Sequence, residues 1–349
     1  MGCTPSSPDV LEPKQTGTAS HTSFEKLYDV KGQLGKGSFA KVCLCMNKKS
    51  KSVNAVKILK KSCEIEEERA ANELEAWKRV GVHDNVVVLL ETYVESGVNY
   101  FVMPQCKCTL NEMLMWKGIH TYYADMLDAF RQIFLGLQHC HATGVAHRDM
   151  KAQNFLVDFD GVVKIADFGL ATSVPEGGLN GIVGSVPYMS PEMVKAQPYG
   201  FKTDVWSCGV SVYLLVYGRY PYQSSCSANS ERKANILKAI KTNVPKPAYQ
   251  PIKGIAHPPA LLQELVKALL QRKAQARPEA RSCADMIMCT IADLKKEVHG
   301  SRAQKNSCNV DLFDDSASTD LPSLRKEQDE SDGLLYALSC GSDFSPRAS

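Results

Sequence analysis

Two short motifs near the middle of the chain restrict its fold and chemistry more than any other feature. Residues 147–154 have the sequence HRDMKAQN, and residues 167–169 have the sequence DFG. The residues between them alternate as two short strands around a polar turn at 158–161. Such a hairpin would place Asn154 and Asp167 at neighbouring positions, and amide and carboxylate oxygens are ligands that suit Mg²⁺. The pair therefore predicts a magnesium site.

A glycine-rich segment and a strand lysine precede these motifs. Residues 34–42 have the sequence LGKGSFAKV, and a glycine-rich hairpin can bring backbone N–H groups close to phosphate oxygens. Lys57 lies on the next expected strand, so its side chain would project toward whatever the glycine segment covers. Each signal alone is weak, since most glycine turns and strand lysines bind nothing. The order of all four features makes a chance combination improbable.

Hydrophobic periodicity divides the middle of the chain into two parts. Alternating apolar residues predict strands over 41–46 and 53–59, and residues 64–80, acidic at the start and basic at the end, predict a helix that stops at Gly81. From 121 onward, apolar residues recur at spacings of three and four, as over 127–137 and 261–270. The pattern predicts a small β-rich lobe followed by a larger helical lobe.

Together these motifs make the chain resemble the eukaryotic protein kinase family over about residues 28–294. Residues 190–192 (SPE) stand where the family usually has Ala-Pro-Glu, residues 204–209 (DVWSCG) match its central helix, and Arg277 matches its late arginine. The resemblance implies an α+β fold, the bilobal protein kinase fold. It also implies ATP-dependent phosphorylation of Ser or Thr hydroxyls on protein substrates, with ATP and Mg²⁺ as cofactors.

The resemblance implies roles for the motif residues. Asp149 would accept the proton or hydrogen bond of the attacking hydroxyl, and Lys151 would stabilise charge on the transferred group. Ser185 would couple the substrate-binding loop to both, and Asn154 and Asp167 would coordinate Mg²⁺. Lysine two residues after the catalytic aspartate is typical of serine/threonine kinases rather than tyrosine kinases.

The same resemblance assigns the nucleotide site. Lys57 would bind the α- and β-phosphates and pair with a helix carboxylate, for which Glu73 and Glu75 are the candidates and the alignment favours Glu73. The other expected nucleotide-binding residues come from the glycine segment, the adenine slot and the hinge: Leu34, Gly35, Lys36, Gly37, Ser38, Val42, Ala55, Met103, Pro104, Cys106 and Leu156.

Other matches imply structural roles. Asp204 is expected to accept hydrogen bonds from the backbone of the 147–154 loop, and Glu192 with Arg277 is expected to form a buried pair. Trp77 and Trp206 are expected in the core.

Two departures from the family pattern concern regulation and specificity. Between Ser173 and Ser185 the chain has no Ser, Thr or Tyr, so Arg148 lacks an obvious phosphate partner and we expect activity without phosphorylation of this segment. Gln153 and Leu214 stand where relatives that favour arginine upstream of the acceptor carry glutamates. We therefore expect a less basic substrate preference. A pseudokinase scaffold is the alternative, disfavoured because the chain retains all the catalytic residue types.

The two ends differ in composition from the middle. We expect a flexible acylated arm over 1–23, a kinase domain over 24–296 and a disordered acidic, serine-rich tail over 297–349. Residues 301–349 hold five Lys or Arg and nine Asp or Glu, a net charge of −4, so with +3 overall residues 1–300 carry +7. This modest charge does not predict a nucleic-acid partner.

The first residues predict location. Gly2 and Ser6 fit the N-myristoylation pattern, and Cys3 lies where a palmitoyl group would make the anchor durable. The longest apolar stretch, 208–217, is too short to span a bilayer, and the odd number of cysteines, 13, favours reduced cytosolic thiols. We expect a cytoplasmic protein tethered to a membrane's cytoplasmic face, as an enzyme or, alternatively, as an interaction protein.

Overall fold

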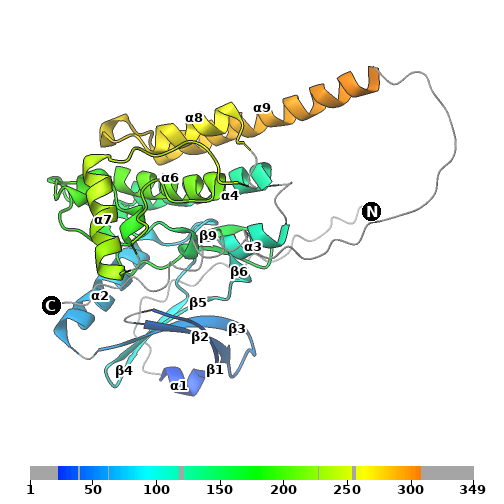
Figure 1. The fold of residues 1–349 in the computed structure, drawn as a ribbon. Helices are drawn as coiled ribbons and strands as arrows, with labels where there is room; N and C mark the ends of the chain where they lie inside the picture. Colours follow the sequence, from blue (N-terminus) through cyan, green and yellow to red (C-terminus); the bar gives the residue numbers. More distant parts are fainter. Residues whose placement is uncertain are drawn as a thin grey trace, which may run out of the picture. The chain divides into compact units, whose positions relative to one another are not determined.

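The computed structural model describes residues 23–37, 40–61, 63–117, 122–226, 228–253 and 257–307, and they form two compact units. Residues up to Lys61 together with Leu89–Pro104 form the N-terminal unit. Ser62–Val88 and the chain from Gln105 onward form the helical unit. This division matches the predicted α+β architecture of a β-rich part and a helical part (Figure 1).

The N-terminal unit is an antiparallel sheet with one short helix. Helix α1 (Phe24–Leu27) precedes strands in the spatial order β1-β2-β3-β5-β4. The strands are β1 (Tyr28–Lys36), β2 (Ala40–Asn47), β3 (Val53–Lys60), β4 (Glu91–Glu95) and β5 (Val98–Pro104). The predicted strands at 41–46 and 53–59 are confirmed as β2 and β3. Their polar connection is fixed by Asn47, whose Oδ1 accepts hydrogen bonds from the backbone N–H groups of Lys49 and Ser50, each at 3.0 Å.

An aromatic cluster around Phe24 covers one face of this sheet. The Phe24 ring stacks on Tyr28 and Tyr100, with ring centroids 5.2 and 4.3 Å apart, and meets the edge of Tyr93 at 5.6 Å. Glu95 accepts hydrogen bonds from the Phe24 backbone N–H and from the Ser23 hydroxyl. Phe24 is fully buried, so the start of the described chain is part of the core of this unit.

We predict that Phe24→Ala lowers the free energy of unfolding by about 3–5 kcal/mol, because it removes a buried aromatic side chain and leaves a cavity. Thermal unfolding followed by circular dichroism measures the change. Val94→Ala is the control, since Val94 in β4 is 62% exposed and its truncation is expected to change stability by less than about 0.5 kcal/mol. Equal effects of the two substitutions would show that α1 does not contribute to the core.

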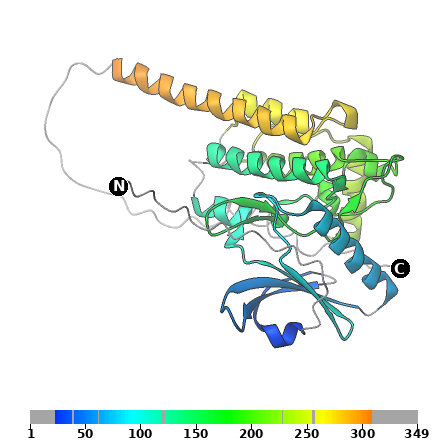
Figure 2. The same ribbon diagram turned by 180° about the vertical axis from the view of Figure 1, so that it is seen from behind.

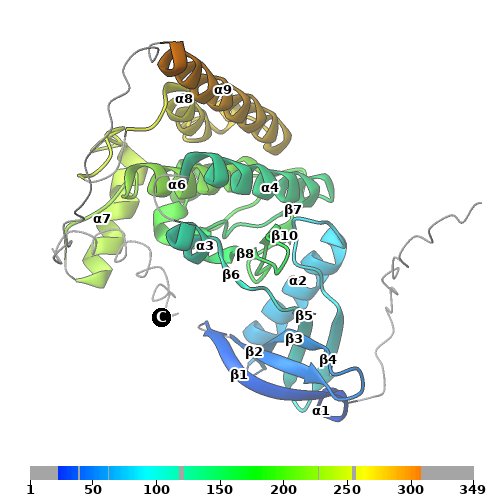
Figure 3. The same ribbon diagram turned by 90° about the vertical axis from the view of Figure 1, so that its right-hand side faces the viewer.

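The helical unit is built around a buried central helix. The helices are α2 (Glu64–Val80), α3 (Leu110–Lys117), α4 (Tyr122–Ala142), α5 (Pro191–Val194), α6 (Lys202–Tyr217), α7 (Asn229–Thr242), α8 (Ala260–Leu269) and α9 (Ala280–Ser307). Every residue of α6 from Thr203 to Tyr217 is buried. Helices α4 and α6 run through the middle of the unit, with α8 and α9 along one side (Figures 2 and 3).

Short elements connect these helices. They are the 3₁₀ helices η2 (Ala152–Asn154), η3 (Val186–Tyr188) and η4 (Ala274–Ala276), and the strands β6 (Cys108–Thr109), β7 (Val145–Ala146), β8 (Phe155–Val157), β9 (Val163–Ile165) and β10 (Thr172–Ser173). The hairpin predicted between residues 154 and 167 is confirmed as β8 and β9, in a sheet of order β6-β8-β9.

Helix α2 has the predicted bounds, and helix α4 has the predicted buried face. Helix α2 ends at Val80, where Gly81 adopts a left-handed φ of 69° that glycine tolerates best. Helix α4 buries all five of its predicted apolar residues: Leu127, Phe130, Ile133, Phe134 and Leu137.

The C-terminal boundary is less well predicted. Helix α9 continues to Ser307, past residue 297, where we expected a disordered tail to begin. Residues 292–305 include Ala, Lys, Glu and Gln, which have high helix propensity, and the helix continues through them. Across the described ranges no helix has the combination of length and apolar character needed to cross a membrane.

Candidate active site

The loop over residues 147–154 is held by a buried carboxylate of α6. Asp204 accepts hydrogen bonds from the backbone N–H groups of His147 and Arg148, at 3.0 and 2.8 Å. These contacts confirm the role predicted for Asp204. His141 of α4, which we did not predict, lies with its Nε2 2.9 Å from the same carboxylate. Burial raises the pKa of Asp204, but the hydrogen bonds and charges of His141 and His147 together lower it more, so the net pKa lies below its ordinary value.

Asp149, Lys151 and Ser185 form a closed set of polar contacts. Lys151 Nζ donates to Asp149 Oδ2 at 2.7 Å and to Ser185 Oγ at 3.1 Å. Ser185 Oγ in turn donates to Asp149 Oδ1 at 3.0 Å. A carboxylate held beside an ammonium group and a hydroxyl can orient an acceptor hydroxyl and receive its proton. The side chains of Asp149 and Lys151 are 10% and 16% exposed, so the set is mostly shielded from water.

A narrow recess beside Asp149 is lined by apolar side chains. Val183, Tyr188, Met189 and Met193 line it together with Arg148, Asp149, Ser185 and Ser207. In this structure the recess is too narrow to hold the side chain of an acceptor residue.

Asn154 and Asp167 are brought close together by the hairpin, as predicted. Strand register pairs Phe155 with Ile165, and the Ala166 N–H donates to the Asn154 carbonyl at 2.9 Å. The amide NH₂ of Asn154 donates to the backbone carbonyl of Asp149 at 2.9 Å, so its Oδ1 is the atom that can coordinate a cation. Asp167 is exposed and has a φ of 66°. One amide oxygen and one carboxylate fit a hard cation such as Mg²⁺.

The Asp-Phe-Gly motif also packs against α2. The buried Phe168 ring lies 5.8 Å from the Trp77 ring and 5.2 Å from the His147 ring, measured between centroids. Trp77 is 1% exposed and donates its Nε1 hydrogen to the Val87 carbonyl at 2.7 Å. The expected core position of Trp77 is confirmed, whereas its contact with the motif was not predicted.

The two candidate carboxylates of α2, Glu73 and Glu75, differ in burial. Glu73 is 2% exposed and lies four residues before Trp77, on the same side of the helix, whereas Glu75 is exposed. A buried carboxylate is costly unless a cation or a donor compensates it. Burial therefore supports the choice of Glu73.

The N-terminal unit carries most of the predicted nucleotide-binding residues. Strand register places Val42 opposite Lys57, and Ala55 opposite Met103, so these side chains share one face of the sheet. Lys57 is 9% exposed on this face. Cys43, Cys45, Val56 and Ile58 point to the opposite face, which Phe24 covers.

The remaining predicted nucleotide-binding residues differ in their surroundings. Gly35 and Lys36 end β1 opposite Val42 and Lys41, and the Gly37 N–H donates to the Ala40 carbonyl at 2.8 Å. Leu34 is 51% exposed, and Pro104 ends β5. Leu156 lies in β8 and Cys106 follows β5, both in the helical unit, and burial raises the pKa of the Cys106 thiol to about 11. Ser38, Gly2 and Cys3 lie outside the described residues.

The segment over 170–189 is held at several points. Arg148 Nε donates to the Leu170 carbonyl at 2.7 Å, and Leu179 pairs with Tyr199 through two backbone hydrogen bonds of 2.7 and 2.9 Å. Gly184 has a φ of 98°, and a Cβ placed there would lie 2.6 Å from the Arg148 carbonyl oxygen. Glycine is therefore required where this segment passes the 147–154 loop.

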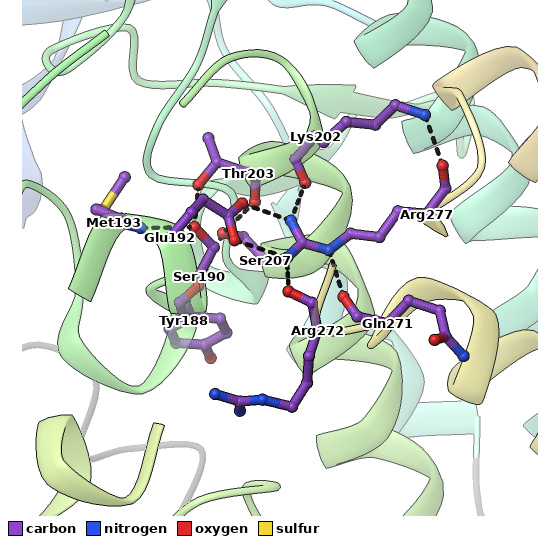
Figure 4. A network of polar contacts seen from close by, with 10 residues as sticks. All are labelled: Tyr188, Ser190, Glu192, Met193, Lys202, Thr203, Ser207, Gln271, Arg272 and Arg277. Carbon is purple, nitrogen blue, oxygen red and sulfur yellow. Dashed lines mark hydrogen bonds and ion pairs between the residues drawn. The ribbon is translucent and has the colours of Figure 1, made fainter. Parts of the chain in front are cut away.

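A buried ion pair fixes the chain after this segment, as predicted. Arg277 Nη1 and Nη2 donate to Glu192 Oε1 and Oε2 at 2.6 and 2.7 Å. Figure 4 shows the guanidinium at the centre of a larger network. It also donates to the carbonyls of Gln271 and Lys202, at 2.7 and 2.8 Å, and lies 5.0 Å from the centre of the Trp206 ring. Trp206 is buried, as expected.

Comparison with known proteins agrees with this geometry. Residues 28–288 match the family model described as a protein kinase domain. The chain is 30% identical to the serine/threonine-protein kinase PEPKR2 of Arabidopsis thaliana, over 84% of this chain and 61% of that protein. It is 34% identical to calcium/calmodulin-dependent protein kinase type 1 of Caenorhabditis elegans, over 61% of this chain and 63% of that protein. The matches thus cover less than two thirds of the length of these curated relatives.

Proposed function

Because the chain belongs to the protein kinase family, we propose that it transfers the γ-phosphoryl group of ATP to serine or threonine hydroxyls of protein substrates. The contact set of Asp149, Lys151 and Ser185 carries this proposal. Asp149 orients the acceptor hydroxyl and receives its proton, and Lys151 stabilises the negative charge that develops beside it. Ser185 joins both groups to the segment that binds the substrate.

The nucleotide and the metal are part of this proposal. When bound, ATP supplies the phosphoryl group and Mg²⁺ neutralises its charge. Asn154 and Asp167 would hold the metal through their side-chain oxygens. Lys57 would bind the α- and β-phosphates, with Glu73 as its partner, an assignment that rests on the family resemblance and on the burial of both side chains.

Transfer of labelled phosphate from ATP to matched Ser, Thr and Tyr peptides tests the proposal. We expect labelling of the Ser and Thr peptides and little labelling of the Tyr peptide. Labelling of the Tyr peptide alone would contradict the assignment of acceptor. No labelling of any peptide or protein mixture would favour the pseudokinase scaffold.

We predict that the enzyme is active without phosphorylation of residues 170–189. The segment has no Ser, Thr or Tyr between Ser173 and Ser185, and Arg148 already donates Nε to the Leu170 carbonyl. Protein treated with a phosphatase and verified by mass spectrometry should keep its full phosphotransfer rate. An inert dephosphorylated protein that recovers only when a residue of 170–189 is modified would contradict this prediction.

We also predict a substrate preference that is less basic than that of arginine-directed relatives. Gln153 cannot form the charge-assisted contact that a glutamate offers to a substrate arginine, and Leu214 is apolar and 1% exposed. A positional peptide library should show at most a few-fold selection for arginine upstream of the acceptor. Strict arginine dependence two or three residues upstream would be the opposite result.

A membrane location is the last part of the proposal. Gly2 would carry a myristoyl group and Cys3 a palmitoyl group, and two acyl chains bind a bilayer durably where one does not. This would keep the enzyme at the cytoplasmic face of a membrane. Mass spectrometry of the N-terminal peptide isolated from cells detects both modifications. The variant Gly2→Ala should move the protein from the membrane fraction to the soluble fraction. Unchanged partition of Gly2→Ala would contradict acyl anchoring.

A further inference from the structure

One segment of the helical unit carries only positive charge among its charged residues. From residue 232 to residue 263 the sequence has no acidic residue. It holds six basic residues, Arg232, Lys233, Lys238, Lys241, Lys246 and Lys253. The segment therefore has a net charge of +6. It covers most of α7, the loop that follows, and the start of α8.

Three of these lysines form an exposed surface, which we call the lysine face: Lys238, Lys241 and Lys246. Helix α7 buries Ile236, Ala239 and Ile240, so Lys238 and Lys241 lie on its outward side, and Lys246 is exposed in the next loop. Within the described part of the chain, none of the three ammonium groups makes an ion pair or hydrogen bond. Val244, between them, is 69% exposed.

Helix α7, which carries two of these lysines, packs against elements of the candidate active site. Helix α7 contacts η3 and α5, and η3 begins immediately after Ser185, whose hydroxyl donates to Asp149. Figures 1 and 3 show α7 at one edge of the helical unit.

The same chain contains a segment of opposite charge. Residues 311–332 hold eight acidic residues and two basic ones, Arg325 and Lys326, for a net charge of −6. The acidic residues are Asp311, Asp314, Asp315, Asp320, Glu327, Asp329, Glu330 and Asp332. We propose that this acidic segment binds the lysine face of its own chain.

Reach and local concentration favour the chain's own segment over a separate partner. Helix α9 ends at Ser307, and the 25 residues from 308 to 332 can extend up to about 80 Å. This reach is about twice the length of α9, which rises by about 1.5 Å per residue. A tethered segment has an effective concentration in the millimolar range, so weak contacts suffice. Exposed charges are screened beyond about 8 Å at physiological ionic strength, so the contact weakens as salt is added. It does not depend on catalytic activity.

Carbodiimide cross-linking of the full chain tests the contact. The reagent joins a lysine amine directly to a carboxyl group that touches it, and mass spectrometry identifies the linked peptides. At micromolar protein and low salt we expect links from Lys238, Lys241 and Lys246 to residues 311–332 within one chain. The links should fall at least five-fold in 0.5 M NaCl and when the eight acidic residues are changed to Asn or Gln.

Charge reversal provides the matched comparison. A bound acidic segment should slow hydrogen exchange at α7 amides beyond the protection that the helix itself gives. The triple variant Lys238→Glu, Lys241→Glu, Lys246→Glu should remove this additional protection. The equally charged variant Lys31→Glu, Lys49→Glu, Lys51→Glu, at exposed residues of the N-terminal unit, should retain that protection. Circular dichroism verifies that both variants fold.

Three results would overturn the proposal. Links from the acidic segment to Lys31, Lys49 and Lys51 that are as frequent as those to the lysine face would show non-specific attraction. Links found only between two copies would assign the face to dimer contacts. If no links formed, and if the chain bound phosphatidylserine vesicles only when the lysine face was intact, the lysine face would be assigned to contact with a membrane surface.

Discussion

Asp149→Asn is expected to slow phosphotransfer to a Ser peptide by about 100- to 10,000-fold, the range that general acid–base groups contribute. The amide keeps the size of the carboxylate, and its oxygen can still accept a hydrogen bond from Lys151 or Ser185. It cannot receive the proton of the acceptor hydroxyl. The rate at saturating ATP and peptide measures the loss.

Asp160→Asn is the matched control. Asp160 is an exposed residue of the turn between β8 and β9, so the same chemical change should leave the rate within about two-fold. Circular dichroism and thermal unfolding should be alike for both variants, since Asp149 is anchored through backbone contacts of its loop as well as through its side chain. An Asp149→Asn enzyme with nearly full activity would show that another group receives the proton.

Local sequence patterns predicted the elements that position this site. The bounds of α2 follow from its charge asymmetry and from Gly81, and the β8–β9 hairpin follows from apolar alternation around a polar turn. Both signals act over a few residues, because they reflect helix capping and strand periodicity. The placement of Asn154 near Asp167 is a direct consequence of the hairpin.

Contacts between distant residues were predictable only where a motif marks them. Asp204 and the pair of Glu192 with Arg277 are marked by the family resemblance, and their contacts are present. His141 beside Asp204, and Glu95 beside Phe24, are ordinary residues at positions that no short pattern distinguishes. Their roles depend on how α4 and β4 pack, which a local pattern does not encode.

Arg277→Met is expected to lower the free energy of unfolding by about 3–5 kcal/mol, because it leaves the Glu192 carboxylate buried without its partner. It also removes the donors to the carbonyls of Gln271 and Lys202. Thermal unfolding measures the change. Arg277→Lys should recover only part of it, since an ammonium group cannot reproduce the planar, two-pronged contact.

A double substitution tests whether the pair itself causes the loss. Arg277→Met combined with Glu192→Leu should cost clearly less than the sum of the two single changes, because no buried charge is then left unpaired. Exact additivity would mean that the carbonyl contacts and the packing on Trp206 dominate instead.

The pair should also give stability a defined dependence on pH. Burial raises the pKa of Glu192, but the hydrogen bonds and charge of Arg277 lower it more, so the net pKa lies below the ordinary value of 4.5. The carboxylate therefore stays ionised in the folded chain at pH values where the unfolded chain is protonated. Its contribution is complete above about pH 4.5 and is lost as the pH falls through the folded-state pKa.

Glu192→Gln isolates this contribution. The stability difference between the original chain and the variant should be constant near neutral pH and should shrink below about pH 4.5. Urea unfolding at a series of pH values measures it. If this stability difference stayed constant down to the acid transition, the Glu192 carboxyl would bind a proton equally well in the folded and unfolded chain. The ion pair would then stabilise the unit through its geometry alone.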